Sequence, residues 1–128
     1  MTPNVPLMLK VLEHVTAHPE EHDQDVWAQK RTVGTCGTVG CLAYHAVVMG
    51  GLDVRWDEVW LPFFVPGATH EADSVTDGRS IEDVAAELLG LRDEQAHEMF
   101  HHATTLRQLW GMAGAYTHGE IVPPPEFA

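Results

Sequence analysis

Positively charged residues are scarce in this sequence, because 7 Lys and Arg stand against 19 Asp and Glu and give a net charge of −12. Such a charge opposes binding to the phosphate backbone of nucleic acids or to an anionic membrane surface. The sequence also lacks an apolar run of the roughly 18 residues that a membrane-spanning helix needs, and no basic segment precedes its first apolar residues. We therefore predict a soluble cytoplasmic protein that binds neither nucleic acid directly nor membranes.

Cysteine is nearly absent as well. Cys36 and Cys41 are the 2 cysteines of the chain, and two thiols five positions apart make no disulfide framework. A thiol pair of this kind fits a reducing compartment. With 128 residues, 45% of them hydrophobic, the chain is long enough to bury about two thirds of its unfolded surface without such crosslinks. Internal repeats and linkers are also missing, so we predict a single helical domain over residues 1–128.

The most apolar stretch of the chain runs from Cys36 to Gly51. Small or apolar residues occupy the positions of one helical face: Val39, Leu42, Ala43, Ala46, Val47 and Gly50. The other faces of such a helix would also be apolar, apart from His45, and a helix that is apolar nearly all round belongs in the middle of a bundle. The pattern predicts a buried central helix over residues 38–50, with Thr38 as its N-cap.

Four other segments have the spacing of helices with one buried face. Their expected capping residues are Asn4, Ser80, Asp93 and either Thr104 or Thr105. Pro19 is expected to end the first of these helices, and Gly90 to end the one that starts after Ser80. A short helical segment is predicted from Asp23, and residues 29–37 are predicted to form a loop before the central helix.

Helical periodicity is lost between residues 52 and 79. Val54 and Trp56 alternate with charged residues and favour a short strand, while Asp77 and Gly78 form a turn signal. We predict an irregular or short-hairpin insertion there. With the helices above, the predicted fold is all-α: a small orthogonal bundle of about five helices around the central helix.

Aromatic residues crowd around prolines inside this insertion. A proline-broken apolar run forms neither a regular helix nor a central strand. It either folds back as a lid on the protein's own core or presents apolar surface to a protein partner, since Trp and Phe dominate interface energetics. The hypothesised partner-binding residues are Trp56, Trp60, Phe63 and Phe64.

One motif has the form of a zinc-hydrolase site. His97 and His101 flank Glu98 in the pattern H-E-x-x-H, which on a helix places two imidazoles on one face and a general base beside them. The expected buried face of this helix, Ala96, Met99, Phe100 and Ala103, leaves the motif at its edge, and no secure third ligand follows. We keep a zinc-dependent hydrolase as an alternative and favour no metal and no cofactor.

A second cluster combines thiols with an imidazole. Cys41 and His45 lie one helical turn apart, with Cys36 five residues earlier. A thiol in the first turn of a helix has a lowered pKa, so these residues could form half a zinc site or a reactive thiol. The alternative is a buried cysteine beside a histidine that hydrogen-bonds within the bundle.

The apolar motifs resemble a family of small uncharacterised proteins from actinobacteria and their bacteriophages. The matching residues are Cys36, Gly37, Thr38, Cys41, Leu42, Ala43, the run Ala86–Leu91, Gln95, Ala96, Met99, Phe100, Thr105, Leu106 and Leu109. A P-E-x-x-x-Q-x-x-W element between Pro19 and Trp27 extends the similarity. The resemblance implies a mainly helical cytoplasmic domain, encoded by a phage or its host, without an assigned activity.

The function that these observations favour is that of a small non-enzymatic interaction or regulatory protein with a protein partner, a host protein if the chain is phage-encoded. A second alternative is an acidic DNA mimic, whose carboxylates would occupy a nucleic-acid-binding protein. That role requires the carboxylates to gather on one face.

Overall fold

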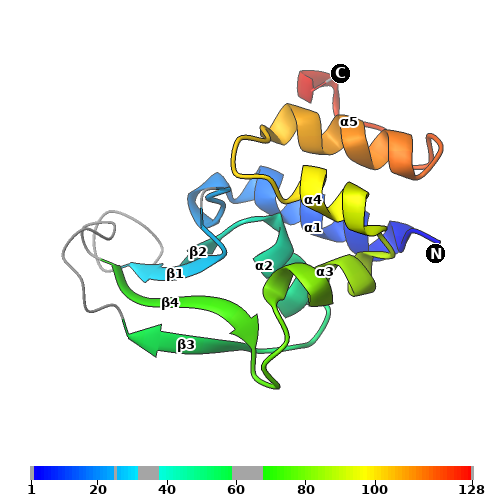
Figure 1. The fold of residues 1–128 in the computed structure, drawn as a ribbon. Coiled ribbons are helices and arrows are strands. Elements are labelled where there is room, and N and C mark those ends of the chain that lie inside the picture. Colours follow the sequence, from blue (N-terminus) through cyan, green and yellow to red (C-terminus); the bar gives the residue numbers. More distant parts are fainter. Residues whose placement is uncertain (1, 25, 32–37, 59–67, 128) are drawn as a thin grey trace.

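The computed structural model describes residues 2–24, 26–31, 38–58 and 68–127. It combines helices with an antiparallel sheet that extends from one end of the helical part (Figure 1). The helices are α1 (Val5–Ala17), α2 (Leu42–Met49), α3 (Ile81–Leu89), α4 (Asp93–Met99) and α5 (Leu106–Tyr116), with short 3-10 turns η1 (Pro19–Glu21) and η2 (Pro125–Phe127). The strands are β1 (Ala28–Arg31), β2 (Thr38–Gly40), β3 (Val54–Glu58) and β4 (Ala68–Val75).

The sheet shows that the prediction of an all-α fold is wrong. Its strand order is β2-β1-β4-β3, and each neighbouring pair is antiparallel. Ala28 of β1 pairs with both Gly40 of β2 and Ala72 of β4. Because β1 and β4 are rich in polar residues and far apart in the sequence, their pairing depends on tertiary contacts and leaves no strong local pattern.

Two strands of this sheet, β3 and β4, lie within the predicted insertion at 52–79. Val54 and Trp56 do lie on a strand, β3, which pairs with β4. The turn at Asp77 and Gly78 lies after β4 and leads into α3, with Val75 N–H donating to the Arg79 carbonyl at 2.8 Å. The turn signal was therefore correctly located, but it does not connect β3 to β4.

The central helix is shorter than predicted. Residues 38–40 belong to strand β2, and α2 begins at Leu42 with Cys41, not Thr38, as its N-cap. The Cys41 N–H donates to the Val26 carbonyl at 2.9 Å, which ties this corner to the segment before β1. Among the described residues, the helical segment expected at Asp23 does not form. Of the loop expected at 29–37, residues 29–31 lie in strand β1 and residues 32–37 lie outside the described part of the chain.

Helix caps were predicted well where a side chain supplies the hydrogen bond. Asn4 Oδ1 accepts from the Leu7 N–H at 3.2 Å, and Ser80 Oγ accepts from the Asp83 N–H at 3.1 Å. Thr105 and Gln108 form a capping box at the start of α5. Gly90 ends α3 with φ +69°, a left-handed conformation that glycine adopts without strain. The cap of α4 is Arg92, one residue before the expected Asp93.

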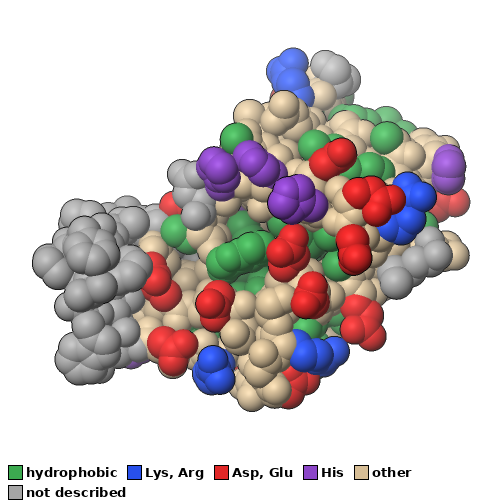
Figure 2. Space-filling model, in the orientation of Figure 1, with side chains coloured by type: hydrophobic (Ala, Val, Ile, Leu, Met, Phe, Trp, Pro, Cys, Tyr) green, Lys and Arg blue, Asp and Glu red, His purple; other side chains and the backbone are tan. Residues whose placement is uncertain are grey.

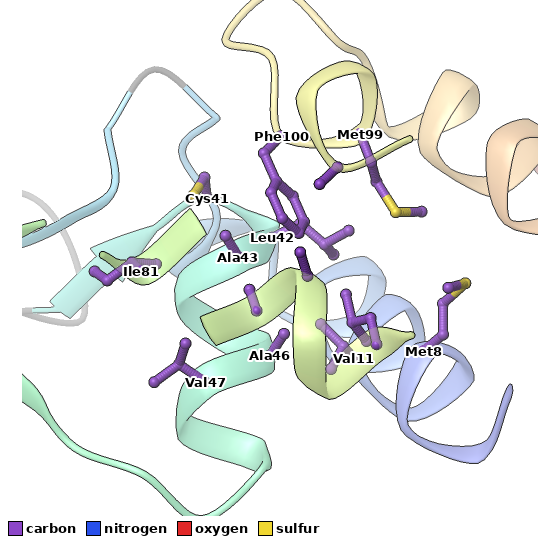
Figure 3. Packing of buried hydrophobic residues seen from close by; sticks show 14 of the residues in the cluster. Met8, Val11, Cys41, Leu42, Ala43, Ala46, Val47, Ile81, Met99 and Phe100 are labelled. Carbon is purple, nitrogen blue, oxygen red and sulfur yellow. The ribbon is translucent and has the colours of Figure 1, made fainter. Parts of the chain in front are cut away.

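The core lies where α1, α2 and α3 pack together, with α4 and α5 covering one side (Figure 3). The predicted inward residues of α1 are all fully buried: Met8, Val11, Leu12 and Val15. From α4, Met99 and Phe100 reach the same cluster, whereas Ala103 is exposed, contrary to expectation. Among the described residues, no helix is both long and apolar enough to cross a membrane.

Candidate functional site

A hollow of about 420 Å³ opens beside the N-terminus of α2 and the end of α4. It is lined by Gln24, Val26, Trp27, Cys41, Glu82, His97, Phe100, His101 and His102. Figure 2 shows histidine side chains gathered along one rim of an apolar depression, with carboxylates beside and below it. The hollow therefore has an apolar wall and a rim of imidazoles.

Gln24 lines this hollow and hydrogen-bonds to two backbone groups at helix ends beside it. Its Nε2 donates to the Met99 carbonyl at 2.9 Å, and its Oε1 accepts from the Leu42 N–H at 3.3 Å. The first group lies at the end of α4 and the second at the start of α2, where backbone groups have no partner within their own helix. His22 Nε2 lies 2.8 Å from the same Oε1. One side-chain amide thus joins two helix ends that face the hollow.

An acidic groove continues from the hollow along α3 and α4. Its volume is about 490 Å³, and it shares Glu82 and His97 with the first hollow. The groove is lined by Glu82, Asp83, Ala86, Asp93, Glu94, Ala96, His97 and Glu98. Arg92 Nε lies 3.3 Å from Glu94 Oε1, an exposed pair of small energetic value. An apolar hollow and five carboxylates therefore form one continuous surface.

The H-E-x-x-H residues are divided between different environments. Because α4 ends at Met99, His101 lies beyond the helix, and its Nδ1 accepts from the Ala103 N–H at 3.1 Å. The rings of His97 and His101 are 6.4 Å apart. Glu98 instead accepts from the Tyr116 hydroxyl at 2.9 Å, and burial together with this carboxylate raises the pKa of Tyr116 to about 12. This arrangement does not favour Glu98 as the base of a zinc hydrolase.

The thiol of Cys41 is buried, with 1% of the residue exposed. Burial raises its pKa to about 11, which is opposite to the lowering that a helix first turn would produce. Its Sγ lies 3.8 Å from the Trp27 carbonyl oxygen. Cys36 lies outside the described residues, so a half zinc site that includes Cys36 stays a prediction.

We expect Cys41 to react slowly with thiol reagents. A thiol with a pKa of about 11 is ionised about 100-fold less at pH 8 than one with the reference pKa of 9.0, and it becomes reactive only as the pH approaches 11. The measurement is the rate of maleimide labelling of a Cys36→Ser variant, folded and in denaturant. Equal rates in the two states would contradict the burial of this thiol.

Trp56 is half-buried and packs on the sheet side of the core. Its ring makes an edge contact with Tyr44 at 6.1 Å between centroids, and Lys30 Nζ lies 4.6 Å from the ring centroid. The other three predicted partner-binding residues, Trp60, Phe63 and Phe64, lie outside the described residues. The choice between a lid and an interface therefore stays open.

A second group of histidines, His14, His18 and His45, comes together in the structure, and the sequence analysis did not predict it. His14 Nε2 lies 3.1 Å from Glu21 Oε1, and His45 Nε2 lies 2.8 Å from the Glu21 carbonyl oxygen. The His14 ring is 5.5 Å from that of His45 and 4.7 Å from that of His18. Burial lowers the pKa of His45 to about 4, so its ring is neutral near pH 7. The available signal was the one-turn spacing of His14 and His18.

Comparison of the chain with protein-family models, curated proteins and solved structures found no match. The resemblance to actinobacterial and phage proteins stays a prediction.

Proposed function

We propose that this chain is a small, non-enzymatic interaction protein that binds a basic segment of a protein partner. The binding surface is the hollow beside α2 together with the acidic groove along α3 and α4. The observation that carries this proposal is their continuity, since Glu82 and His97 line both. If the chain is phage-encoded, as the sequence resemblance implies, the partner is a host protein.

The hollow suits an apolar anchor of the partner. Trp27 is half-buried and Phe100 is 5% exposed, so both are held by the core while part of their surface lines the hollow. Interfaces take most of their binding energy from a few apolar or aromatic side chains seated in such depressions. The imidazoles of His97 and His101 on the rim add polar contacts around the anchor.

The acidic groove favours a partner segment with positive charge. Its five carboxylates are Glu82, Asp83, Asp93, Glu94 and Glu98, and Lys or Arg side chains complement them. The net charge of −12 adds long-range attraction for a basic partner and speeds its association. Because exposed ion pairs are screened by salt, binding should weaken as ionic strength rises.

The test is a selection of peptides from a random display library on the immobilised protein. We expect the enriched peptides to combine an aromatic or large aliphatic residue with nearby Lys or Arg. In solution, the double variant Glu82→Lys and Asp93→Lys should weaken the affinity of such a peptide by about tenfold or more, because it replaces attraction with repulsion in the groove. Fluorescence anisotropy at two salt concentrations measures both effects.

Glu120→Lys combined with Asp73→Lys is the matched control. Both residues are exposed and line neither the hollow nor the groove, so this variant changes the net charge equally. It should reduce the affinity much less than the groove variant. Equal losses would mean that only net charge matters, and the proposed surface would be wrong.

The DNA-mimic alternative differs in the partner, not in the surface. It is favoured by the gathering of carboxylates on the face shown in Figure 2. In this form of the proposal the basic partner binds nucleic acid, and duplex DNA should displace this protein from it. A partner that binds DNA and this protein at the same time would contradict the mimic.

A further inference from the structure

Three side chains of types that can bind metals, one from each of three elements, meet on the side of α2 that carries His45. His14 lies in the last turn of α1, Glu21 in η1, and His45 in α2. One ligand atom from each of these three residues lies within 4.8 Å of the others. His45 is buried and the other two are half-buried, so the group is sheltered from bulk water.

The types of ligand select a class of ion. Two imidazoles and one carboxylate form a set that Zn²⁺ takes in three-ligand protein sites, with a remaining position for water or a further side chain. Imidazole favours divalent transition metals over Mg²⁺ or Ca²⁺, which prefer oxygen ligands alone. His18 lies close to this group, because its ring is 4.7 Å from that of His14 and its Nδ1 is 3.6 Å from Glu21 Oε2.

The distances are compatible with an ion after a small adjustment. With bonds of about 2.1 Å, tetrahedral ligand atoms lie about 3.4 Å apart. His14 Nε2 and Glu21 Oε1 are already 3.1 Å apart. The other ligand atoms lie within 4.8 Å of one another, so they would have to approach by at most about 1.4 Å. Side-chain rotation of His14 and Glu21, each 30% exposed, can supply this movement.

The backbone orients the imidazole of His45. Its Nε2–H donates to the Glu21 carbonyl at 2.8 Å, which leaves the lone pair on Nδ1. Histidines that bind metals commonly donate their other ring N–H to a backbone carbonyl or carboxylate in this way. The same residue, Glu21, therefore supplies a carboxylate to the group and holds one of its imidazoles through the main chain.

We propose that His14, Glu21 and His45 form a binding site for one divalent transition-metal ion such as Zn²⁺. The site lies apart from the proposed docking surface, with which it shares no lining residue. An ion there joins α1, η1 and α2, and so it stabilises the folded chain by an amount that grows with the logarithm of its affinity.

The test is titration of chelator-stripped, untagged protein with ZnCl₂, followed by calorimetry. We expect one Zn²⁺ per chain, and a loss of affinity of at least about 100-fold in Glu21→Gln and in His14→Gln, since each removes a direct ligand. Both side chains are half-buried rather than core residues, and circular dichroism checks that each variant is folded. Zn²⁺ should raise the melting temperature of the unmodified protein and leave that of Glu21→Gln unchanged.

Matched controls are His97→Gln and His101→Gln, which remove imidazoles from the hollow instead. They should bind Zn²⁺ as the unmodified protein does. Co²⁺ serves as a spectroscopic probe, and its spectrum should lack thiolate charge-transfer bands because the proposed ligands are nitrogen and oxygen. Absence of binding, loss of binding in the control variants, or a thiolate signature from Cys36 and Cys41 would each overturn the proposal.

Discussion

Replacing Trp110 with alanine should lower the free energy of unfolding by about 3–5 kcal/mol, the usual cost of removing a large aromatic side chain from a core. Trp110 is 2% exposed and belongs to the core cluster. Its Nε1–H donates to Thr16 Oγ1 at 3.0 Å, which joins α5 to α1. The variant therefore loses both a packed ring and a contact between helices. Urea unfolding followed by circular dichroism measures the change.

Two milder variants separate packing from hydrogen bonding at this position. Trp110→Phe keeps an aromatic ring but removes the donor, and Thr16→Val removes the acceptor while keeping the shape. Each should cost less than Trp110→Ala, and their effects should be less than additive because they remove the same hydrogen bond. Val122→Ala is the control, since Val122 is 73% exposed. A loss in Trp110→Ala no larger than in this control would contradict the described core.

Gly40→Ala should destabilise the protein by about 1–3 kcal/mol, because the added methyl group has no space. A Cβ at Gly40 would lie 2.6 Å from the Trp27 carbonyl oxygen and 2.5 Å from Tyr44 Cδ2. The Tyr44 ring can move, but the Trp27 carbonyl is backbone and accepts from the Cys41 N–H at 3.3 Å. Accommodating the methyl group therefore shifts the segment that leads into α2. Thermal and urea unfolding measure the loss.

Gly111→Ala is the matched control for this substitution, and it should have the opposite sign. Gly111 lies within α5, and a Cβ there meets nothing within 4 Å. Alanine is favoured over glycine inside a helix by about 0.5–1 kcal/mol, so the variant should be more stable than the original protein. If both variants change stability in the same direction, the close packing described at Gly40 is wrong.

The features that the sequence predicted correctly, helix caps and the buried face of α1, depend only on residues close together in the chain. Asn4, Ser80 and Thr105 cap helices through bonds to backbone groups three residues on, so the pattern and its physical cause lie in one turn of chain. The buried face of α1 follows from helical spacing in the same way. Trp60, Phe63 and Phe64 lie outside the described residues, so their predicted role in partner binding stays a prediction.

The sheet could not be predicted in this way because its partners lie far apart in the chain. Lys30 pairs with both Thr38 and His70, and neither pairing is implied by the residues around Lys30. Apolar residues over 38–50 matched a helix, yet residues 38–40 pair with β1. Pairing with β1 outweighed local helix preference there, as tertiary context commonly does.

In the candidate sites, too, local spacing was visible in the sequence, whereas contacts between distant segments were not. The spacing of His97 and His101 was visible in sequence, but the end of α4 at Met99 was not, and it places His101 outside the helix. Conversely, Glu21 and His45 come together only because η1 folds back against α2, and so the group with His14 had no continuous motif. Gln24 belongs to the P-E-x-x-x-Q-x-x-W element, but nothing in that pattern indicates its contacts with two helix ends.

The strand order β2-β1-β4-β3 also has a consequence for synthesis of the chain. In the sequence, β2 follows β1 closely, whereas β4, the partner of the other edge of β1, is synthesised later. At about 5–20 residues per second, the intervening residues 32–67 take about 2–7 s to emerge from translation. During that time the edge of β1 is open to pairing with other chains, a hazard that charged side chains on edge strands reduce. Lys30, a charged residue of β1, thus reduces aggregation of the nascent chain before β4 is synthesised.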